Sequence, residues 1–305
     1  MKNLIRLTDY KAKDVYEIFD IADEIIQGKY KDILNGKTVV LFFPNSSIRT
    51  RVTFEKGIRL LGGQAVLFPS DTLDKRENSK DVIGYLNNWA DVIVVRHKDI
   101  AMLETMSQYS KVPVINALTA INHPCEMLAD MYALSKIRKD FTKDKYLFCG
   151  LKGNIGLAWK EAADVMGFEL SQCCADGYEM EGVPVYHNIE DAIIGKDIVC
   201  TDSLPSDVLE KSSGCQVTKA VMEKANKGAV LNPCPPFYRG EEVSGEVIDS
   251  EYFVGYEFKK YLLEIQQAVI IYCMINQMII SKNPQFTGIS ARQQLEFTTH
   301  LLLTD

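Results

Sequence analysis

The chain has 305 residues, enough for one large domain or two of ordinary size. Hydrophobic residues make up 47% and charged residues 25%, a globular composition that excludes a mainly disordered chain. The net charge of -7 argues against general nucleic-acid binding, which needs a basic face.

The N-terminal segment and the cysteines indicate the compartment. No apolar core precedes a small-residue cleavage site, so the pattern does not predict a secretory signal. The eight cysteines include no CxxC pair, and several lie in apolar, strand-like runs. Polar residues interrupt the longest apolar run, near residues 262–280, which favours a buried helix over a membrane span. We therefore predict a cytoplasmic protein with mostly inert thiols.

Short β-rich runs recur along the chain, and helix-like segments separate many of them. In the first half they read TVVLFF, QAVLFP, DVIVVR and VPVINA. In the second half they read KYLFCG, FELSQCCA, DIVCTD and GAVLNPC. Alternating strands and helices predict parallel sheets with right-handed crossovers, and the continuous apolar character predicts strands covered on both faces.

The strand series restarts near residue 140, after the charged segment SKIRKDFTKDK. We therefore predict an α/β protein with two doubly wound parallel-sheet domains joined by helices, occupying residues 1–140 and 141–256. Residues 257–305 are predicted to hold a helix that ends near residue 282 and returns to the first domain. The tail from residue 283 has weak periodicity and receives no assignment.

The segment NSSIRT lies between the strand TVVLFF and a helical face formed by Phe54, Ile58 and Leu61. It is predicted to be the strand-to-helix turn and the first helical turn. Backbone N–H groups at a helix start, joined by hydroxyls and a guanidinium, make a site for a phosphate-like anion. The spacing is equally consistent with a serine cap followed by two solvated arginines.

Two further segments follow predicted strands. In NHPCEMLAD, Pro124 suits the first helical position and places His123 at the N-cap. In NPCPPFYRGEEVS, consecutive prolines form a rigid turn with one possible cis bond, flanked by Cys234 and Arg239. Each segment alone could be purely structural. Because all three follow strands, they can converge at the carboxyl edges of parallel sheets, where ligands bind.

Together these segments resemble the aspartate/ornithine carbamoyltransferase family, and the sequence is most similar to its ornithine branch. SIRTR followed by FE resembles the phosphate motif Ser-x-Arg-Thr-Arg, and HPCEMLAD resembles His-Pro-x-Gln-x-Leu-x-Asp. CPPFYRGEEV resembles Cys-Leu-Pro-x-x-Arg-Gly-Glu-Glu-Val, and TDSLPSD resembles Thr-Asp-x-x-x-Ser-Met-Gly. The resemblance covers most of the chain but not the tail.

The resemblance implies transfer of the carbamoyl group from carbamoyl phosphate to an amine, with release of phosphate and without a metal or organic cofactor. The expected acceptor is ornithine or an ornithine-like amino acid. The implied donor-binding residues are Ser47, Ile48, Arg49, Thr50, Arg96, His123, Glu126 and Arg239. The implied catalytic residues are Arg96, His123, Asp202 and Cys234. The implied acceptor-binding residues are Asn154, Asp202, Ser206 and Cys234.

The resemblance also implies assembly, because family members are trimers in which a loop of the neighbouring subunit completes each site. The segment DKRENSKD matches the place of that loop, with Lys75 and Ser79 as the candidate residues. We therefore expect a homotrimer with shared sites, carbamoyl phosphate and a small amine as ligands, and no nucleic-acid or membrane partner.

Several positions depart from the family pattern, mainly on the acceptor side. The family Gln is Glu126, and the Leu-Pro of the cysteine motif is Pro235-Pro236. The Gly-Asp-x-Asn-Asn region of the ornithine branch reads GLKGNIG, so its Asp is Leu151 and only Asn154 matches.

These departures bear on the identity of the acceptor. The acceptor loop retains Ser206, but Asp207 stands where Met is usual. NSSIRTR is also similar to the succinylornithine and acetylornithine branch, so N-acylornithine, putrescine and aspartate stay open as acceptors. An anion near a bound phosphate is repelled, and we therefore predict that Glu126 suits a cationic acceptor.

Two rival functions remain open. CGLKGNIGLAWKEAA follows a strand and opens a helix, with Asp176 further along, which resembles a dinucleotide-binding fingerprint, although Gly153 falls one place late. The second rival is a non-catalytic relative that binds carbamoyl phosphate or another anion as a sensor. Glu126 and the altered acceptor loop motivate that rival, and the other retained site residues argue against it.

The remaining conspicuous residues receive structural interpretations. His97 and His187 are predicted to make local hydrogen bonds, and Cys173 and Cys174 to lie in the core. We find no His/Cys/Asp cluster with the spacing of metal ligands.

Overall fold

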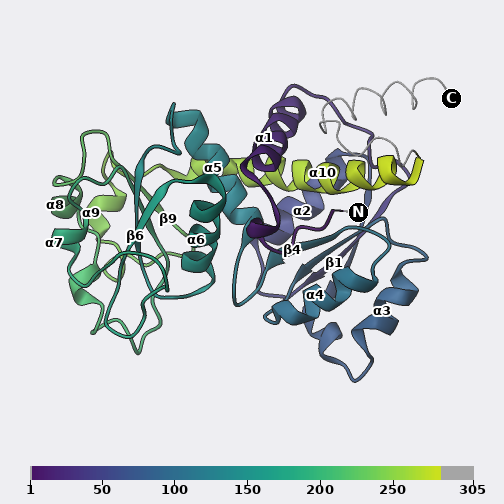
Figure 1. Cartoon of the computed structure of the whole chain (residues 1–305), viewed down its shortest axis with the longest axis horizontal. Helices are drawn as coiled ribbons and strands as arrows, with labels where there is room; N and C mark the ends of the chain where they lie inside the picture. The colour runs from purple at the N-terminus through teal and green to yellow at the C-terminus, as the bar shows by residue number, and fades with distance from the viewer. Residues whose placement is uncertain (1, 283–305) are drawn as a thin grey trace. The chain divides into compact units, whose positions relative to one another are not determined.

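The computed structural model describes residues 2–282, with side chains up to residue 275 (Figure 1). Within this part the chain forms two compact units. The first unit comprises residues 2–132 and 261–282, and the second unit comprises residues 133–260. The division falls inside helix α5 (Pro124–Ile137), whereas the predicted functional boundary at residue 140 stays a prediction. The unassigned tail from residue 283 lies outside the described residues.

The first unit contains a four-stranded parallel sheet in the order β2-β1-β3-β4. The strands are β1 (Thr38–Phe43), β2 (Gln64–Pro69), β3 (Val92–Arg96) and β4 (Val114–Leu118). β1, β2 and β3 lie within predicted β-rich runs, and β4 extends one residue beyond the run VPVINA, to Leu118. The chain winds outward from β1 to β2 and then returns to the other side of β1 for β3 and β4. The direction of winding therefore reverses between β1 and β3.

Helices cover both faces of this sheet (Figure 1). They are α1 (Ala12–Ile26), α2 (Arg49–Leu60), α3 (Ser79–Leu86), α4 (Ile100–Tyr109), the start of α5, and α10 (Leu262–Lys282). Short 3₁₀ helices span Leu7–Asp9 and Ser70–Asp74. On one face, Ile83 of α3 and Leu103 of α4 pack in one cluster with strand residues that include Ile93. The predicted helical face of Phe54, Ile58 and Leu61 is confirmed as fully buried.

The C-terminal helix begins later than predicted. Residues Tyr256–Tyr261 form a 3₁₀ helix, and α10 begins at Leu262. Within the first unit α10 packs against α1 and α2, and the Gln267 amide donates to the Gly57 carbonyl at 3.0 Å. A side chain at Gly57 would collide with Gln267, because an added Cβ would lie 2.9 Å from its Cγ. Among residues 2–282, no helix is long and apolar enough to cross a membrane.

One prediction about the first sheet is wrong, because β2 is not covered on both faces. Within residues 2–282 it pairs only with β1, and it is largely exposed along its length. Val66 is 40% and Phe68 is 37% exposed, although the run QAVLFP is as apolar as its neighbours. An apolar edge strand left open in this way is a site for association.

The second unit contains a five-stranded parallel sheet in the order β7-β6-β5-β8-β9. The strands are β5 (Lys145–Cys149), β6 (Glu169–Cys173), β7 (Val185–Tyr186), β8 (Ile198–Thr201) and β9 (Val230–Pro233). The sequence did not predict β7, because two residues carry no recognisable periodicity. The winding direction here reverses between β5 and β8.

Helices again cover both faces. They are α6 (Asn154–Met166), α7 (Ile189–Ala192), α8 (Lys219–Met222) and α9 (Gly245–Ile248), with a 3₁₀ helix at Ser213–Cys215. On the α6 side, Phe168 stacks on Tyr146 of β5, and Trp159 packs against the same ring at a tilt. The predicted fold class, two parallel-sheet α/β units, is therefore confirmed.

Candidate functional site

The first unit holds a group of candidate residues where winding reverses in its sheet. Arg96 ends β3, and Ser47 and Thr50 lie between β1 and the first turn of α2. Nη1 of Arg96 donates to Ser47 Oγ at 3.1 Å and to Thr50 Oγ1 at 3.2 Å. The pairing of β3 with β4 shifts register at Arg96, and such irregularities re-aim side chains. The structure therefore joins two sequence-predicted segments at the position where open α/β sheets bind ligands.

The sequence left open whether the two arginines of SIRTR bind an anion or are solvated helix-surface residues, and the structure gives them different positions. Arg49 is the first residue of α2 and is exposed beside Ile48, which is 71% exposed. Arg51 instead forms an ion pair with Glu55 at 2.6 Å, one helical turn away. Arg51 is therefore a helix-surface residue, whereas Arg49 lies at the helix end where unpaired backbone N–H groups attract anions.

The start of α5 brings His123 and Glu126 into the first unit. The helix begins at Pro124 as predicted, and the His123 carbonyl accepts from the Met127 N–H at 3.2 Å. His123 and Glu126 are 5% and 6% exposed, so both are buried polar groups. Glu126 lies in the first helical turn, where a carboxylate is stabilised by the helix dipole.

The second unit holds its own group of candidate residues at the carboxyl edge of its sheet. Asp202 follows β8 and accepts the backbone N–H of Ser203 at 2.9 Å. Burial raises the pKa of Asp202 to about 6. Ser206 is exposed further along this loop, and half-buried Asn154 begins α6 after β5.

Glu242, in the motif CPPFYRGEEV, is a buried carboxyl that its sequence pattern does not distinguish from its neighbours. Its Oε1 accepts the Tyr238 N–H at 2.8 Å, and its Oε2 is buried with no hydrogen-bond partner among the described residues. Burial raises the pKa of Glu242, and the negative charges of Glu241 and Asp202 add to the rise. The second unit therefore holds two desolvated carboxyls, and the charge of Asp202 acts on Glu242.

The turn after β9 has the predicted rigid geometry. The Pro235-Pro236 bond is cis. Cys234 is buried, and its backbone N–H donates to the Thr201 carbonyl at 3.0 Å, which ties this turn to the end of β8. Arg239 donates to the Gly245 carbonyl at 2.9 Å and pairs with Asp249 at the same distance. The structure thus gives Arg239 partners inside the second unit, and its role toward the donor stays a prediction.

The candidate neighbour-loop residues lie directly after the exposed strand β2. Lys75 follows the 3₁₀ helix Ser70–Asp74, and Ser79 is the first residue of α3. Asn78 caps α3 by accepting the Lys80 N–H at 2.9 Å. His97 contacts Asp74 at 3.0 Å, which confirms its predicted local hydrogen-bonding role.

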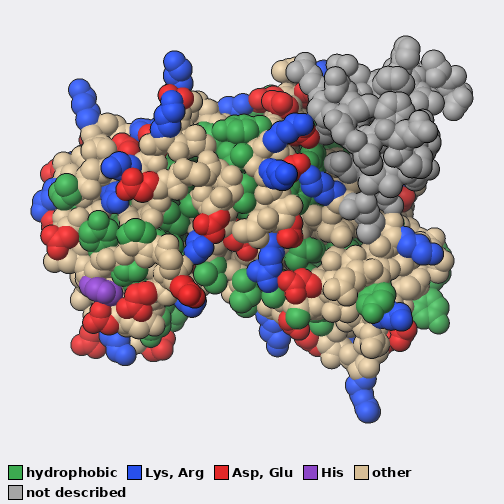
Figure 2. All heavy atoms as spheres, in the orientation of Figure 1, with side chains coloured by type: hydrophobic (Ala, Val, Ile, Leu, Met, Phe, Trp, Pro, Cys, Tyr) green, Lys and Arg blue, Asp and Glu red, His purple; other side chains and the backbone are tan. Residues whose placement is uncertain are grey.

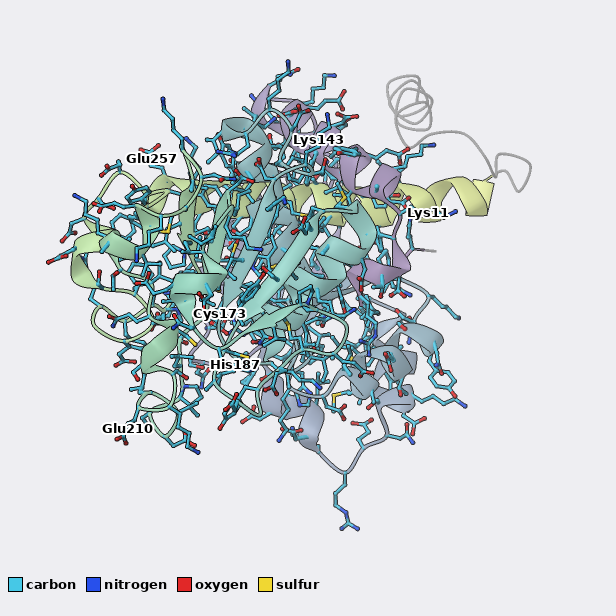
Figure 3. All side chains as sticks on the ribbon, turned by 60° about the vertical axis from the view of Figure 1, so that its left-hand side comes forward. Lys11, Lys143, Cys173, His187, Glu210 and Glu257 are labelled. Atoms are coloured by element: carbon cyan, nitrogen blue, oxygen red, sulfur yellow. The ribbon has the colours of Figure 1, made fainter. Side chains whose placement is uncertain are left out.

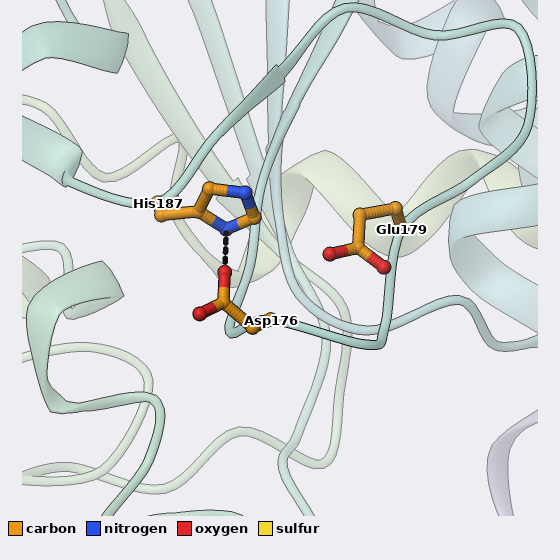
Figure 4. A group of neighbouring side chains, drawn as sticks. All are labelled: Asp176, Glu179 and His187. Atoms are coloured by element: carbon orange, nitrogen blue, oxygen red, sulfur yellow. Dashed lines mark ion pairs between the residues drawn. The ribbon is translucent and has the colours of Figure 1, made fainter.

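Residues near the end of β6 form a cluster that the sequence spacing did not reveal. β6 ends at Cys173, and His187 follows the neighbouring strand β7 (Figure 3). The His187 Nδ1 lies 2.9 Å from the Cys174 carbonyl and 3.2 Å from Asp176, and Glu179 faces the same ring (Figure 4). The Cys174 carbonyl first, and then these two carboxylates, raise the pKa of His187.

One possible metal-ligand atom from each of Asp176, Glu179 and His187 lies within 4.8 Å of the other two. The sequence spacing did not predict this group. All three residues are exposed, and the ion pair of His187 with Asp176 accounts for the arrangement. Asp176, the acidic residue of the dinucleotide interpretation, is thus engaged with the imidazole. Cys173 and Cys174 are buried as predicted.

Comparisons with known proteins match both halves of the chain. The sequence profile described as "Aspartate/ornithine carbamoyltransferase, carbamoyl-P binding domain" matches residues 2–136. The profile of the "Asp/Orn binding domain" of the same family matches residues 143–273. An ornithine carbamoyltransferase of Hydrogenovibrio crunogenus is 33% identical over 297 residues, covering 90% of this chain and 98% of that protein. The chain belongs to the aspartate/ornithine carbamoyltransferase family.

Other members of the carbamoyltransferase family are similar to this chain in sequence and in structure. An ornithine carbamoyltransferase of Methanobrevibacter smithii is 32% identical over 300 residues, covering 88% of this chain and 98% of that protein. The structure of the ornithine carbamoyltransferase from Pyrococcus furiosus superimposes with a TM-score of 0.84 at 28% identity. The superposition covers 90% of this chain and 97% of the Pyrococcus furiosus chain. The family membership makes this chain a carbamoyltransferase, and the dinucleotide alternative falls away.

Proposed function

We propose that the chain transfers the carbamoyl group of carbamoyl phosphate to ornithine and releases phosphate. Binding of carbamoyl phosphate is supported by the contact of Arg96 with both Ser47 and Thr50, at the point where winding reverses in the first sheet. A guanidinium and two hydroxyls beside a helix N-terminus match a phosphate in charge and hydrogen bonding. The names of the relatives support ornithine as the acceptor.

In this proposal the residues act mainly by position and charge. The neutral amine nitrogen attacks the carbamoyl carbon, the new C–N bond forms, and the bond from that carbon to the phosphate oxygen breaks. One proton of the attacking nitrogen leaves with the phosphate. Arg96 and the SIRTR turn hold the charge of the departing phosphate, and His123 polarises the carbamoyl oxygen. Asp202, Cys234 and Asn154 orient the acceptor.

The carboxyls of the second unit support a cationic acceptor. Asp202 and Glu242 are both desolvated, and no cation among the described residues pairs with either side chain. A buried carboxylate is stabilised by a cation that binds beside it. Ornithine brings two ammonium groups, of which the attacking one must first lose its proton. An anionic acceptor such as aspartate suits this environment less well.

A screen of amines tests the function directly. Purified protein receives carbamoyl phosphate with ornithine, N-acetylornithine, N-succinylornithine, putrescine or aspartate, and released phosphate and the carbamoylated product are measured. We expect ornithine to give the highest kcat/KM. Preference for an N-acylated ornithine would reassign the acceptor within the family, and no turnover with any amine would favour the sensor alternative.

We further propose a cytoplasmic homotrimer with sites completed by the neighbouring subunit. The open apolar edge of β2 supports assembly, because an exposed strand edge pairs readily with another surface. Apolar side chains are also exposed over the α3 end of the first unit (Figure 2). Tyr85 and Trp89 contribute exposed aromatic surface there, and the segment from β2 to the start of α3 holds Lys75 and Ser79.

Mixing inactive chains tests the shared sites. One chain carries Arg49→Ala, and the other carries Lys75→Ala with Ser79→Ala. In a cyclic trimer of both chains, roughly one site in three combines an intact phosphate turn with an intact neighbouring loop. We therefore expect activity to return in co-refolded mixtures. Verified mixed trimers that stay as inactive as the parents would contradict shared sites.

A further inference from the structure

Lys152 lies in the loop that follows the central strand of the second sheet. Winding reverses between β5 and β8, so a ligand of this sheet is expected between the loops that follow these two strands. The two loops are adjacent, because a Cβ added to Gly150 would lie 3.6 Å from the backbone nitrogen of Asp202. Lys152 and Asp202 therefore belong to the two loops that border this position.

The backbone of Lys152 is anchored while its side chain is exposed. Its N–H donates to the Tyr178 carbonyl at 2.9 Å. The Gln172 amide donates to that same carbonyl at 3.0 Å and to the Gly150 carbonyl at 2.9 Å. Gln172, from the neighbouring strand β6, thus contacts the start of the turn directly and is linked to Lys152 through the shared Tyr178 carbonyl. The hydrogen bonds therefore fix the backbone of Lys152, and its side chain extends into solvent from that position.

The ammonium of Lys152 has no ion-pair or hydrogen-bond partner among residues 2–275. Other lysines of this region do: Lys160 pairs with Asp164 at 2.8 Å, and Lys145 pairs with Glu169 at 3.6 Å. The adjacent Leu151 is uncharged, so the β5 loop carries a net positive charge. The β8 loop instead contributes the half-buried, desolvated carboxyl of Asp202, with Glu242 near it.

A cation on one loop and carboxyls on the other form a charge pattern complementary to a zwitterion. We propose that Lys152 is a specificity residue that binds the carboxylate of an amino-acid acceptor and thereby discriminates against amines that lack a carboxylate. This inference rests on the proposed carbamoyl transfer and adds to it the residue that selects the acceptor. Lys152 contacts only the carboxylate end and takes no part in the bond changes.

The test compares two acceptors that differ only in the carboxylate. L-Ornithine and 1,4-diaminobutane are assayed at saturating carbamoyl phosphate with the wild type and Lys152→Met. A lost charged contact weakens binding about ten- to a hundredfold. We expect kcat/KM for ornithine to fall by that factor, mainly through KM, while the value for the diamine stays unchanged. Lys152→Arg should retain most of the preference for ornithine.

Lys160→Met is the matched control, because it removes a lysine from the following helix α6 that already pairs with Asp164. It should leave both acceptors unaffected. Equal loss on both amines in Lys152→Met would show a structural role, and unchanged use of ornithine would show a merely solvated lysine. Either result overturns the proposal.

A binding measurement covers the case in which the wild type does not use the diamine. Inhibition constants are then compared for 2-aminopentanoate, which keeps the carboxylate, and butylamine, which differs from it only by lacking the carboxylate. Lys152→Met should weaken only 2-aminopentanoate, and equal effects on both would overturn the proposal. If the amine screen yields no turnover, the proposed function fails, whereas turnover with an unchanged acceptor preference in Lys152→Met refutes only the role of Lys152.

Discussion

Replacing Arg96 with alanine is expected to lower kcat by about a hundred- to a thousandfold, the usual effect of removing a donor that stabilises developing charge. The guanidinium is held at the end of β3 by Ser47 and Thr50, so its orientation is set before the donor binds. Its loss removes a fixed positive charge and leaves the two hydroxyls without their shared donor. The affinity for carbamoyl phosphate should fall in parallel, as measured by calorimetry.

Two further variants separate charge from geometry. Arg96→Lys keeps the charge but lacks the planar fork, so it should recover only a small part of the activity. Arg59→Ala removes an exposed arginine in the last turn of α2 and should leave kcat and donor affinity near the wild type. Wild-type kinetics in Arg96→Ala would exclude this arginine from the donor site.

Asp202→Asn is expected to stabilise the protein at alkaline pH while impairing acceptor use. Burial raises the pKa of Asp202 from 3.8 to about 6. The folded state therefore holds a proton that the unfolded state has already released, and this contribution to stability is lost as pH rises through about 6. Above that pH the ionised carboxylate of the wild type lowers the free energy of unfolding by about 3 kcal/mol. The neutral amide of Asp202→Asn has no such effect.

The measurement is denaturant unfolding of the ligand-free protein at pH 5 and pH 8. The stabilisation by Asp202→Asn should be larger at pH 8, and kcat/KM for ornithine should fall about ten- to a hundredfold. Glu251→Gln, at an exposed carboxylate of the same unit, is the control and should change neither quantity. A variant that is less stable than the wild type at pH 8 would refute the desolvated carboxylate.

Local sequence patterns were sufficient to predict most elements and the segments of the site. TVVLFF and QAVLFP are β1 and β2 to the residue, and α5 begins at Pro124. Apolar runs, helical spacing and the proline preference for a helix start depend on neighbours within a few residues, so they can be read along the chain. The residue motifs likewise carried the resemblance to the carbamoyltransferase family.

The positions of the elements and the contacts between motifs were decided only by the tertiary structure. Strand order places the β1 and β3 loops side by side and so brings Arg96 to Ser47 and Thr50, which precede it by more than forty residues. The same long-range pairing leaves β2 at an open edge, although its composition is that of a covered strand.

For the second unit, the sequence by itself determined that Asp202 and Glu242 both occur in motifs after strands. Only the fold decided that they are desolvated and influence each other, and that Lys152 lies on the loop beside Asp202 without a partner among the described residues. The physical reason is that burial and electrostatic coupling depend on distances through space, which arise from strand pairing between segments far apart in the chain.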